Sequence, residues 1–176
     1  MLAITRGEIK NFLKSDAKVL HFAPEAILKT KFREHFSNYI TADLFADADL
    51  VLNLENIDLE DDQYDLIIAN HVLEHVDDRK AASELRRILR SGGVFVCQVP
   101  IIEGWDSTYE NDEITSERLR WIHFGQGDHV RYYGSDFRER FCTAGFKLDK
   151  EFTSEGSDVI RYGLNRGEKV FVFEKI

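Results

Sequence analysis

The stretch YDLIIANHVLEHVDDRKAASELRRILRSGGVFVCQVP, residues 64–100, decides the fold of this chain. Residues 65–70 and 94–99 are short apolar runs, and each is predicted to be a buried strand. Residues 78–89 between them have helical spacing, with Ala82, Leu85 and Ile88 on one side and charges on the other. Ser91-Gly92-Gly93 is expected to break that helix. A strand, a helix and a second strand in this order predict a right-handed βαβ crossover in a parallel sheet.

The rest of the chain extends this alternation. Further helices are expected at residues 5–14, 24–36 and 135–144, and further strands at 18–22, 39–43, 50–54, 146–153 and 169–175. Pro24 suits the opening of the second helix, whose inward face should carry Ile27, Leu28, Phe32 and Phe36, and Ser135 is expected to cap the last helix. Residues 154–167 are predicted to be a polar loop, so the last two strands should pair as an antiparallel hairpin.

Composition and length set the broad class. The 176 residues, 43% of them hydrophobic, suit one α/β domain over residues 1–176, with the long aromatic connection at about 101–134 as a lid. With no run of eighteen apolar residues and no signal-like start, we expect a soluble cytoplasmic protein without a membrane partner. A formal charge of −9 disfavours nucleic acid, and Cys97 and Cys142 are expected to be small core residues. The oligomeric state is not indicated.

Ligands of parallel sheets bind beyond the carboxyl ends of the strands, where Asn70, His71 and Pro100 should lie. The segments VLHFAPEAI (19–27), TADLF (41–45), NLENIDLEDDQYDLIIANHVLEHV (53–76) and ELRRILRSGG (84–93) resemble successive motifs of the class I, Rossmann-like S-adenosylmethionine-dependent methyltransferases. HFAPE together with FGQGDHVRYYG (124–134) is also similar to a subgroup of small bacterial, type 11-like methyltransferases that share FGQxDHVRxYG.

This resemblance implies a doubly wound, seven-stranded sheet that is mostly parallel and has an antiparallel strand near the C-terminus. It implies S-adenosylmethionine as cofactor, S-adenosylhomocysteine as product and an unidentified acceptor, which we expect to be a small molecule. Asp43 would bind the ribose hydroxyls, Asn53 and Leu54 the adenine, and Asn70 and His71 the methionine part. The implied cofactor-binding residues are His21, Phe22, Ala23, Glu25, Asp43, Leu44, Asn53, Leu54, Asn70, His71 and His75.

One departure from the family concerns the first loop, which normally carries glycines that let the backbone approach the cofactor. Residues 21–27 contain no glycine. Ala23 is small enough for a close approach, and Glu25 could bond the amino group of the cofactor or offset its sulfonium charge. The alternative is a module of the same fold that no longer binds cofactor. A nicotinamide enzyme is disfavoured because no G-x-G-x-x-G phosphate cradle is present.

A hydroxyl or amine acceptor needs a group that removes its proton, and this group should sit on the lid. His129 is the first candidate, since Asp128 and Arg131 could orient or polarise it, and His123 is the second. Each histidine could instead bond the lid to the sheet, and Arg131 could grip a carboxylate or phosphate of the substrate.

His71-Val72-Leu73-Glu74-His75 also matches H-x-x-E-H, the zinc-binding pattern of inverted zinc proteases. Those proteases carry the motif within a long helix, whereas here it directly follows a predicted strand. His71 and His75 are therefore expected to line the cofactor pocket or pack the short helix, and no metal is expected.

Overall fold

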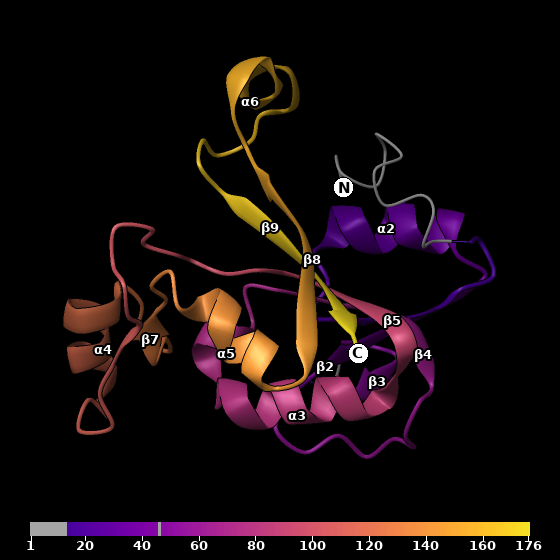
Figure 1. The fold of residues 1–176 in the computed structure, drawn as a ribbon, viewed down its shortest axis with the longest axis horizontal. Coiled ribbons are helices and arrows are strands. Elements are labelled where there is room, and N and C mark those ends of the chain that lie inside the picture. The colour runs from indigo at the N-terminus through magenta and orange to yellow at the C-terminus, as the bar shows by residue number, and fades with distance from the viewer. Residues whose placement is uncertain (1–13, 46) are drawn as a thin grey trace.

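The structure, a computed structural model, describes residues 14–45 and 47–176, so all but the last residue of the helix predicted at 5–14 lies outside the described residues. One seven-stranded sheet has the order β3-β2-β1-β4-β5-β9-β8, and β6 and β7 form a separate pair (Figure 1). The strands are β1 (Lys18–Phe22), β2 (Asn38–Asp43), β3 (Leu50–Val51), β4 (Tyr64–Asn70), β5 (Leu89–Gln98), β6 (Tyr109–Glu110), β7 (Arg131–Tyr132), β8 (Phe146–Thr153) and β9 (Lys169–Lys175). The helices are α2 (Ala26–His35), the 3-10 turn η2 (Leu73–His75), α3 (Asp78–Ile88), α4 (Glu117–Phe124), α5 (Phe137–Thr143) and α6 (Gly156–Tyr162).

The directions of the strands confirm the predicted fold class. Strands β1 to β5 pair in parallel, and β9 pairs antiparallel with both β5 and β8. The chain order reverses at β1, which lies between β2 and β4. The register pairs Phe22 with both Ala42 and Ala69, so β1, β2 and β4 end at the same edge of the sheet. In a doubly wound sheet this edge, beside the point of reversal, is where ligands bind.

Two apolar cores cover the two faces of the sheet. The larger core joins alternate residues of the strands to apolar side chains of α3 and α5, among them Leu85 and Phe141. The smaller core joins the other residues of the strands to Phe32 of α2 and to Phe36 just after it. Figure 1 shows the same layering, with α2 on one side of the sheet and α3 and α5 on the other.

The boundary between α3 and β5 differs from the prediction. The helix ends at Ile88, and β5 begins at Leu89 and runs through Ser91-Gly92-Gly93. These residues form an irregularity in the pairing of β4 with β5 and do not end the helix. A Cβ on Gly93 would lie 2.7 Å from the Arg90 carbonyl oxygen and 3.2 Å from that of Tyr64. The glycine therefore permits the bulge, because a side chain would collide with both strands.

Several further predictions about single residues were wrong. Ile27 is 75% exposed because Leu28 and Phe32, four residues apart, form the buried side of α2 and Ile27 lies off that side; Leu28, Phe32 and Phe36 do face the core as predicted. Cys97 is buried, but Cys142 lies on the exposed side of its helix.

The predicted bounds changed at three other places. The third strand is shortened to two residues. The last α-helix of the predicted set, α5, starts after Asp136 without a side-chain cap, so Ser135 does not cap it. The predicted polar loop at 154–167 contains α6, at the tip of the predicted antiparallel hairpin of β8 and β9 (Figure 1).

The predicted lid, residues 101–134, is folded around its own small sheet and α4, and lies beside α5 (Figure 1). Its strand β7 also contacts η2. The Ile102 amide donates to the Tyr133 carbonyl (2.8 Å), so both ends of the lid are held together. Ser116 caps α4 by accepting from the Leu119 amide (3.3 Å). None of the described helices is long and apolar enough to cross a bilayer.

Candidate functional site

The ends of β1 and β4 share an unusual backbone conformation. Ala23, directly after β1, has a φ of +44°, and His71, directly after β4, has a φ of +53°. Both lie in the left-handed region, which glycine occupies freely and other residues occupy at a cost. The Ala23 amide donates to the Ala42 carbonyl of β2 (2.8 Å), and the His71 amide donates to the Gln98 carbonyl of β5 (2.8 Å). Backbone strain of this kind persists where the surrounding structure fixes it, and it clusters at functional sites.

Glu25, Asn70 and His21 meet at this edge. The Asn70 side-chain amide donates to Glu25 (3.4 Å), and His21 Nε2 lies 3.6 Å from the same carboxylate. Burial raises the pKa of Glu25, but its interactions with His21 and Asn70 outweigh burial and lower it, so the carboxylate is ionised at neutral pH. Asn70 Oδ1 is buried and has no hydrogen-bond partner among the described residues. A buried amide oxygen without a donor is costly, which indicates a missing ligand or water.

His21 has a different environment from that of Glu25. Its side chain is fully buried, packs against Phe32 and shares a hydrogen bond of 2.7 Å between Nδ1 and the Tyr39 hydroxyl. His21 therefore lies on the buried side of Glu25 and positions its carboxylate. Tyr39 did not emerge from the sequence, because its role depends on the β1–β2 register.

The remaining predicted cofactor residues lie along the ends of β2 and the segment after β3. Asp43 is half-buried, and its Oδ1 accepts from the Phe45 amide (3.1 Å). Leu44 beside it is 58% exposed, whereas Phe22 and Leu54 are buried in the larger core. Asn53 is exposed, and its Oδ1 accepts from the Glu55 amide (2.9 Å).

The lid is fastened to η2 by its segment GDHVRYYG. The Val130 amide donates to the Glu74 carbonyl (2.9 Å). Arg131 is only 7% exposed; its Nη1 donates to the carbonyls of Leu73 (2.9 Å) and Val76, and its Nε to the Glu110 carboxylate (2.9 Å). These contacts and the burial place Arg131 in a network that joins the lid to η2.

Three further residues complete that network. Arg140 of α5 makes a two-pronged ion pair with the buried Asp78 (2.8 and 3.0 Å) and also donates to Glu110 (3.0 Å). The Tyr133 hydroxyl lies 3.1 Å from both the Leu73 carbonyl and Asp78. The Asp78 and Glu110 roles were missed from the sequence, since only the tertiary fold brings α3, α5 and the lid together.

His75 and His129, which lie next to this network, pack against each other. The rings of His75 and His129 meet edge to face, with centroids 4.7 Å apart. His129 is 4% exposed, and burial, followed by the charge of His75, lowers its pKa. His75 Nδ1 lies 3.3 Å from the exposed Asp128 carboxylate.

The other two candidate histidines have different surroundings. His71 is half-exposed, and the Glu74 carboxylate, 3.6 Å away, raises its pKa. His123 of α4 is partly exposed and shares a 2.7 Å hydrogen bond between Nδ1 and the Tyr109 hydroxyl. The structure therefore separates the two predicted lid histidines, with His129 packed under η2 and His123 accessible.

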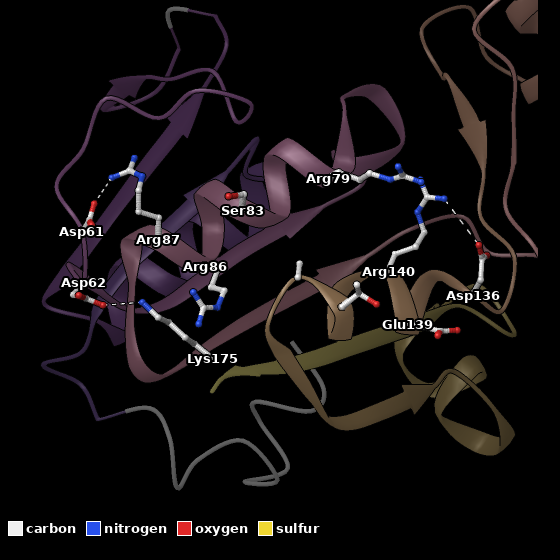
Figure 2. Close-up of a pocket in the computed structure, with 12 residues that line it drawn as sticks. Asp61, Asp62, Arg79, Ser83, Arg86, Arg87, Asp136, Glu139, Arg140 and Lys175 are labelled. Atoms are coloured by element: carbon white, nitrogen blue, oxygen red, sulfur yellow. Dashed lines mark hydrogen bonds and ion pairs between the residues drawn. The ribbon is translucent and has the colours of Figure 1, made fainter.

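Two surface cavities lie away from the edge that carries Ala23, Asp43 and Asn70. An open groove of about 870 Å³ runs between α3 and α5 and contains no predicted site residue; Figure 2 shows it lined by ion pairs such as Asp61 with Arg87. A second cavity of about 620 Å³ lies between the start of α3 and the lid and includes His75 and Arg131. The edge itself is identified by the left-handed backbone of Ala23 and His71 and by the unpaired Asn70 Oδ1.

Comparisons of the sequence and of the structure with known proteins both find methyltransferases. Residues 17–97 match the family described as "Methyltransferase domain", and no curated protein matches the chain. An S-adenosylmethionine-dependent methyltransferase from Mesorhizobium loti is 13% identical, with a TM-score of 0.66 over 96% of both chains. The 1,6-didemethyltoxoflavin-N1-methyltransferase of Burkholderia thailandensis, solved with its substrate and S-adenosylhomocysteine, is 15% identical, with a TM-score of 0.67 over 98% of this chain and 75% of that one.

A methyltransferase from Methanosarcina mazei is similar too, at 12% identity and a TM-score of 0.63 over 96% of this chain and 97% of that one. The sequence identities are low, so these likenesses concern the architecture of the whole chain. The chain therefore has the fold of S-adenosylmethionine-dependent methyltransferases, and its residues 17–97 match the methyltransferase domain family.

Proposed function

We propose that the protein is a methyltransferase that uses S-adenosylmethionine to methylate a small molecule. The observation that carries this proposal is the conformation of the glycine-free turn. Ala23 adopts the left-handed backbone that a glycine would supply at the end of β1, so the turn keeps the shape without the residue. This argues against the alternative of a module that has lost its cofactor.

The side chains at the edge fit the cofactor chemically. S-adenosylmethionine carries a positive sulfonium, an amino group and two neighbouring ribose hydroxyls. The ionised Glu25 would face the positive charges, the unpaired Asn70 Oδ1 would accept from the amino group, and Asp43 would accept from the ribose hydroxyls. Asn53, Leu54 and Leu44 would border the adenine, His71 the methionine part, and His21 would position Glu25.

The bound cofactor would supply a methyl group on a sulfonium for in-line displacement by the acceptor. The protein must align the acceptor and accept its proton if the nucleophile is a hydroxyl or an amine. We propose that His123 accepts this proton, because its ring is accessible and is hydrogen-bonded to the Tyr109 hydroxyl. His129 and Arg131 are buried against η2, and Asp128 pairs with His75 of η2. These three residues therefore hold the lid against η2.

The surface of the lid supports a small acceptor. Its exposed aromatic side chains, Trp105 (41% exposed) and Trp121 (57% exposed), offer flat apolar surface for a ring or a chain.

A thermal-shift titration with S-adenosylhomocysteine tests the cofactor. Saturation at about 100 times the Kd should stabilise the fold by about 2.7 kcal/mol. Asp43→Ala should abolish the shift, and Asp47→Ala, an exposed aspartate four residues later, should leave it unchanged. A shift with NAD but none with S-adenosylhomocysteine would contradict the proposal, and no shift with either would favour the non-catalytic module.

A further inference from the structure

Three potential metal ligands converge where the lid meets η2. Glu74 and His75 come from η2, and His129 comes from the lid segment that follows α4. Each side chain contributes one potential ligand atom, and these three atoms lie within 4.8 Å of one another. The hydrogen bond from the Val130 amide to the Glu74 carbonyl fixes the two segments side by side. The cluster is therefore built by the fold, and Glu74 also lies 3.6 Å from His71 at the cofactor edge.

Two of these side chains have buried polar atoms that no neighbour satisfies. Glu74 is 1% exposed and His129 is 4% exposed. Glu74 Oε2 and His129 Nδ1 have no hydrogen-bond partner among the described residues. A carboxylate oxygen and an imidazole nitrogen left bare in the interior destabilise the fold unless a ligand binds both.

The other ring nitrogens of the two histidines are occupied. His75 Nδ1 pairs with Asp128 (3.3 Å), and the His129 ring interacts with the Phe124 backbone, while its Nδ1 has no hydrogen-bond partner among the described residues. Histidines that bind metals show this arrangement, in which a carboxylate or a backbone carbonyl fixes the orientation of the ring and leaves one nitrogen for the metal.

We propose that Glu74, His75 and His129 bind one divalent transition-metal ion of the zinc class, which fastens the lid to η2. Two imidazole nitrogens and one carboxylate suit zinc, whereas calcium and magnesium require sets of oxygen ligands. Three protein ligands leave one coordination position open to water. The site differs from the H-x-x-E-H arrangement, because its second histidine comes from the lid and not from His71.

The test is zinc binding by the full-length, tag-free protein after chelator treatment and dialysis. We expect one zinc per chain by elemental analysis and a rise in Tm with added zinc sulfate. His75→Gln is the safest ligand variant, since His75 is partly exposed, and it should weaken zinc binding at least about 100-fold in a chelator competition. Asp128→Asn should weaken binding by roughly 10- to 100-fold, as expected of a residue that orients a ligand.

The matched control is His35→Gln on the exposed side of α2, which should bind zinc as the wild type does. His129→Gln and Glu74→Gln, checked for folding by circular dichroism, should lose the metal. Wild-type protein that binds no zinc more tightly than about 10 μM, or His75→Gln protein that binds it as the wild type does, would overturn the proposal. S-adenosylhomocysteine binding is measured separately, so failure at this site leaves the methyltransferase proposal untouched.

Discussion

The replacement of Arg131 by methionine distinguishes a structural role of this arginine from a role in gripping substrate. The side chain is buried and donates to the carbonyls of Leu73 and Val76 and to the carboxylate of Glu110. Methionine has a similar length and fills most of the space, so the cavity contribution is small. The loss of the charged donor should dominate the change.

The expected cost follows from what the partners retain. Glu110 keeps Arg140 as a donor (3.0 Å), and the Leu73 carbonyl keeps the Tyr133 hydroxyl (3.1 Å). Only the Val76 carbonyl loses the charged donor outright, and a hydrogen bond to a charged group contributes about 1.5–3 kcal/mol. We expect Arg131→Met to lower the free energy of unfolding by about 3 kcal/mol.

Tyr133→Phe alone should cost about 1 kcal/mol, because the hydroxyl donates one hydrogen and each possible acceptor, the Leu73 carbonyl or Asp78, keeps an arginine. The double variant removes both donors of the Leu73 carbonyl, so it should cost about 1 kcal/mol more than the sum of the single changes. Urea denaturation at neutral pH measures all three values. If Arg131→Met unfolds within about 0.5 kcal/mol of the wild type but no longer transfers methyl groups, Arg131 contacts the substrate and the structural role is refuted.

Three other substitutions test separate parts of the structure. The backbone amide and hydroxyl of Thr41 lower the pKa of Asp49 from its usual 3.8. Because the carboxylate is 42% exposed and screened by solvent, its contribution should be less than about 1 kcal/mol, present above pH 3.8 and lost as the pH falls further. The stability gap between wild type and Asp49→Asn should therefore close in acid, and a gap that persists unchanged at the lowest pH would be contrary. A Cβ on Gly134 would lie 2.5 Å from the Ser107 carbonyl carbon, so Gly134→Ala should lower the free energy of unfolding by about 2 kcal/mol in a denaturation experiment. Gly104 has open space around it, so the control Gly104→Ala should change stability by less than about 0.5 kcal/mol. Equal costs for the two variants would contradict this packing. Ala23→Gly relieves a left-handed alanine and should keep or improve S-adenosylhomocysteine affinity in calorimetry, and a tenfold loss would show that the methyl group contacts the ligand.

The fold was predictable because its signals are local and repeated. The apolar runs of β4 and β5 and the helical spacing of α3 define the βαβ unit, and no tertiary contact contradicts them. The misplaced boundaries arose where tertiary structure decides. Ser91-Gly92-Gly93 resembles a helix stop, but the pairing of Leu89 with Tyr64 draws this segment into the sheet. Leu28 and Phe32, four residues apart, form the buried side of α2, so Ile27 lies off that side and stays exposed despite its apolar side chain.

The candidate site was predictable only in part, for a similar reason. Ala23, Asp43 and Asn70 follow strand ends, and parallel strands bring their carboxyl ends to one edge. His129 packs against His75, and Arg131 donates to the Leu73 carbonyl, both more than fifty residues earlier on η2, and no periodicity indicates such contacts. The sequence therefore could not show that these lid residues are buried against η2.

A crystal structure of the protein with S-adenosylhomocysteine would test the proposed cofactor site most directly. We predict the ribose hydroxyls within about 3.2 Å of the Asp43 carboxylate and the amino group of the ligand beside Glu25 and Asn70 Oδ1. Density for the ligand in the groove between α3 and α5, or an Asp43 side chain turned away from the ribose, would contradict this assignment.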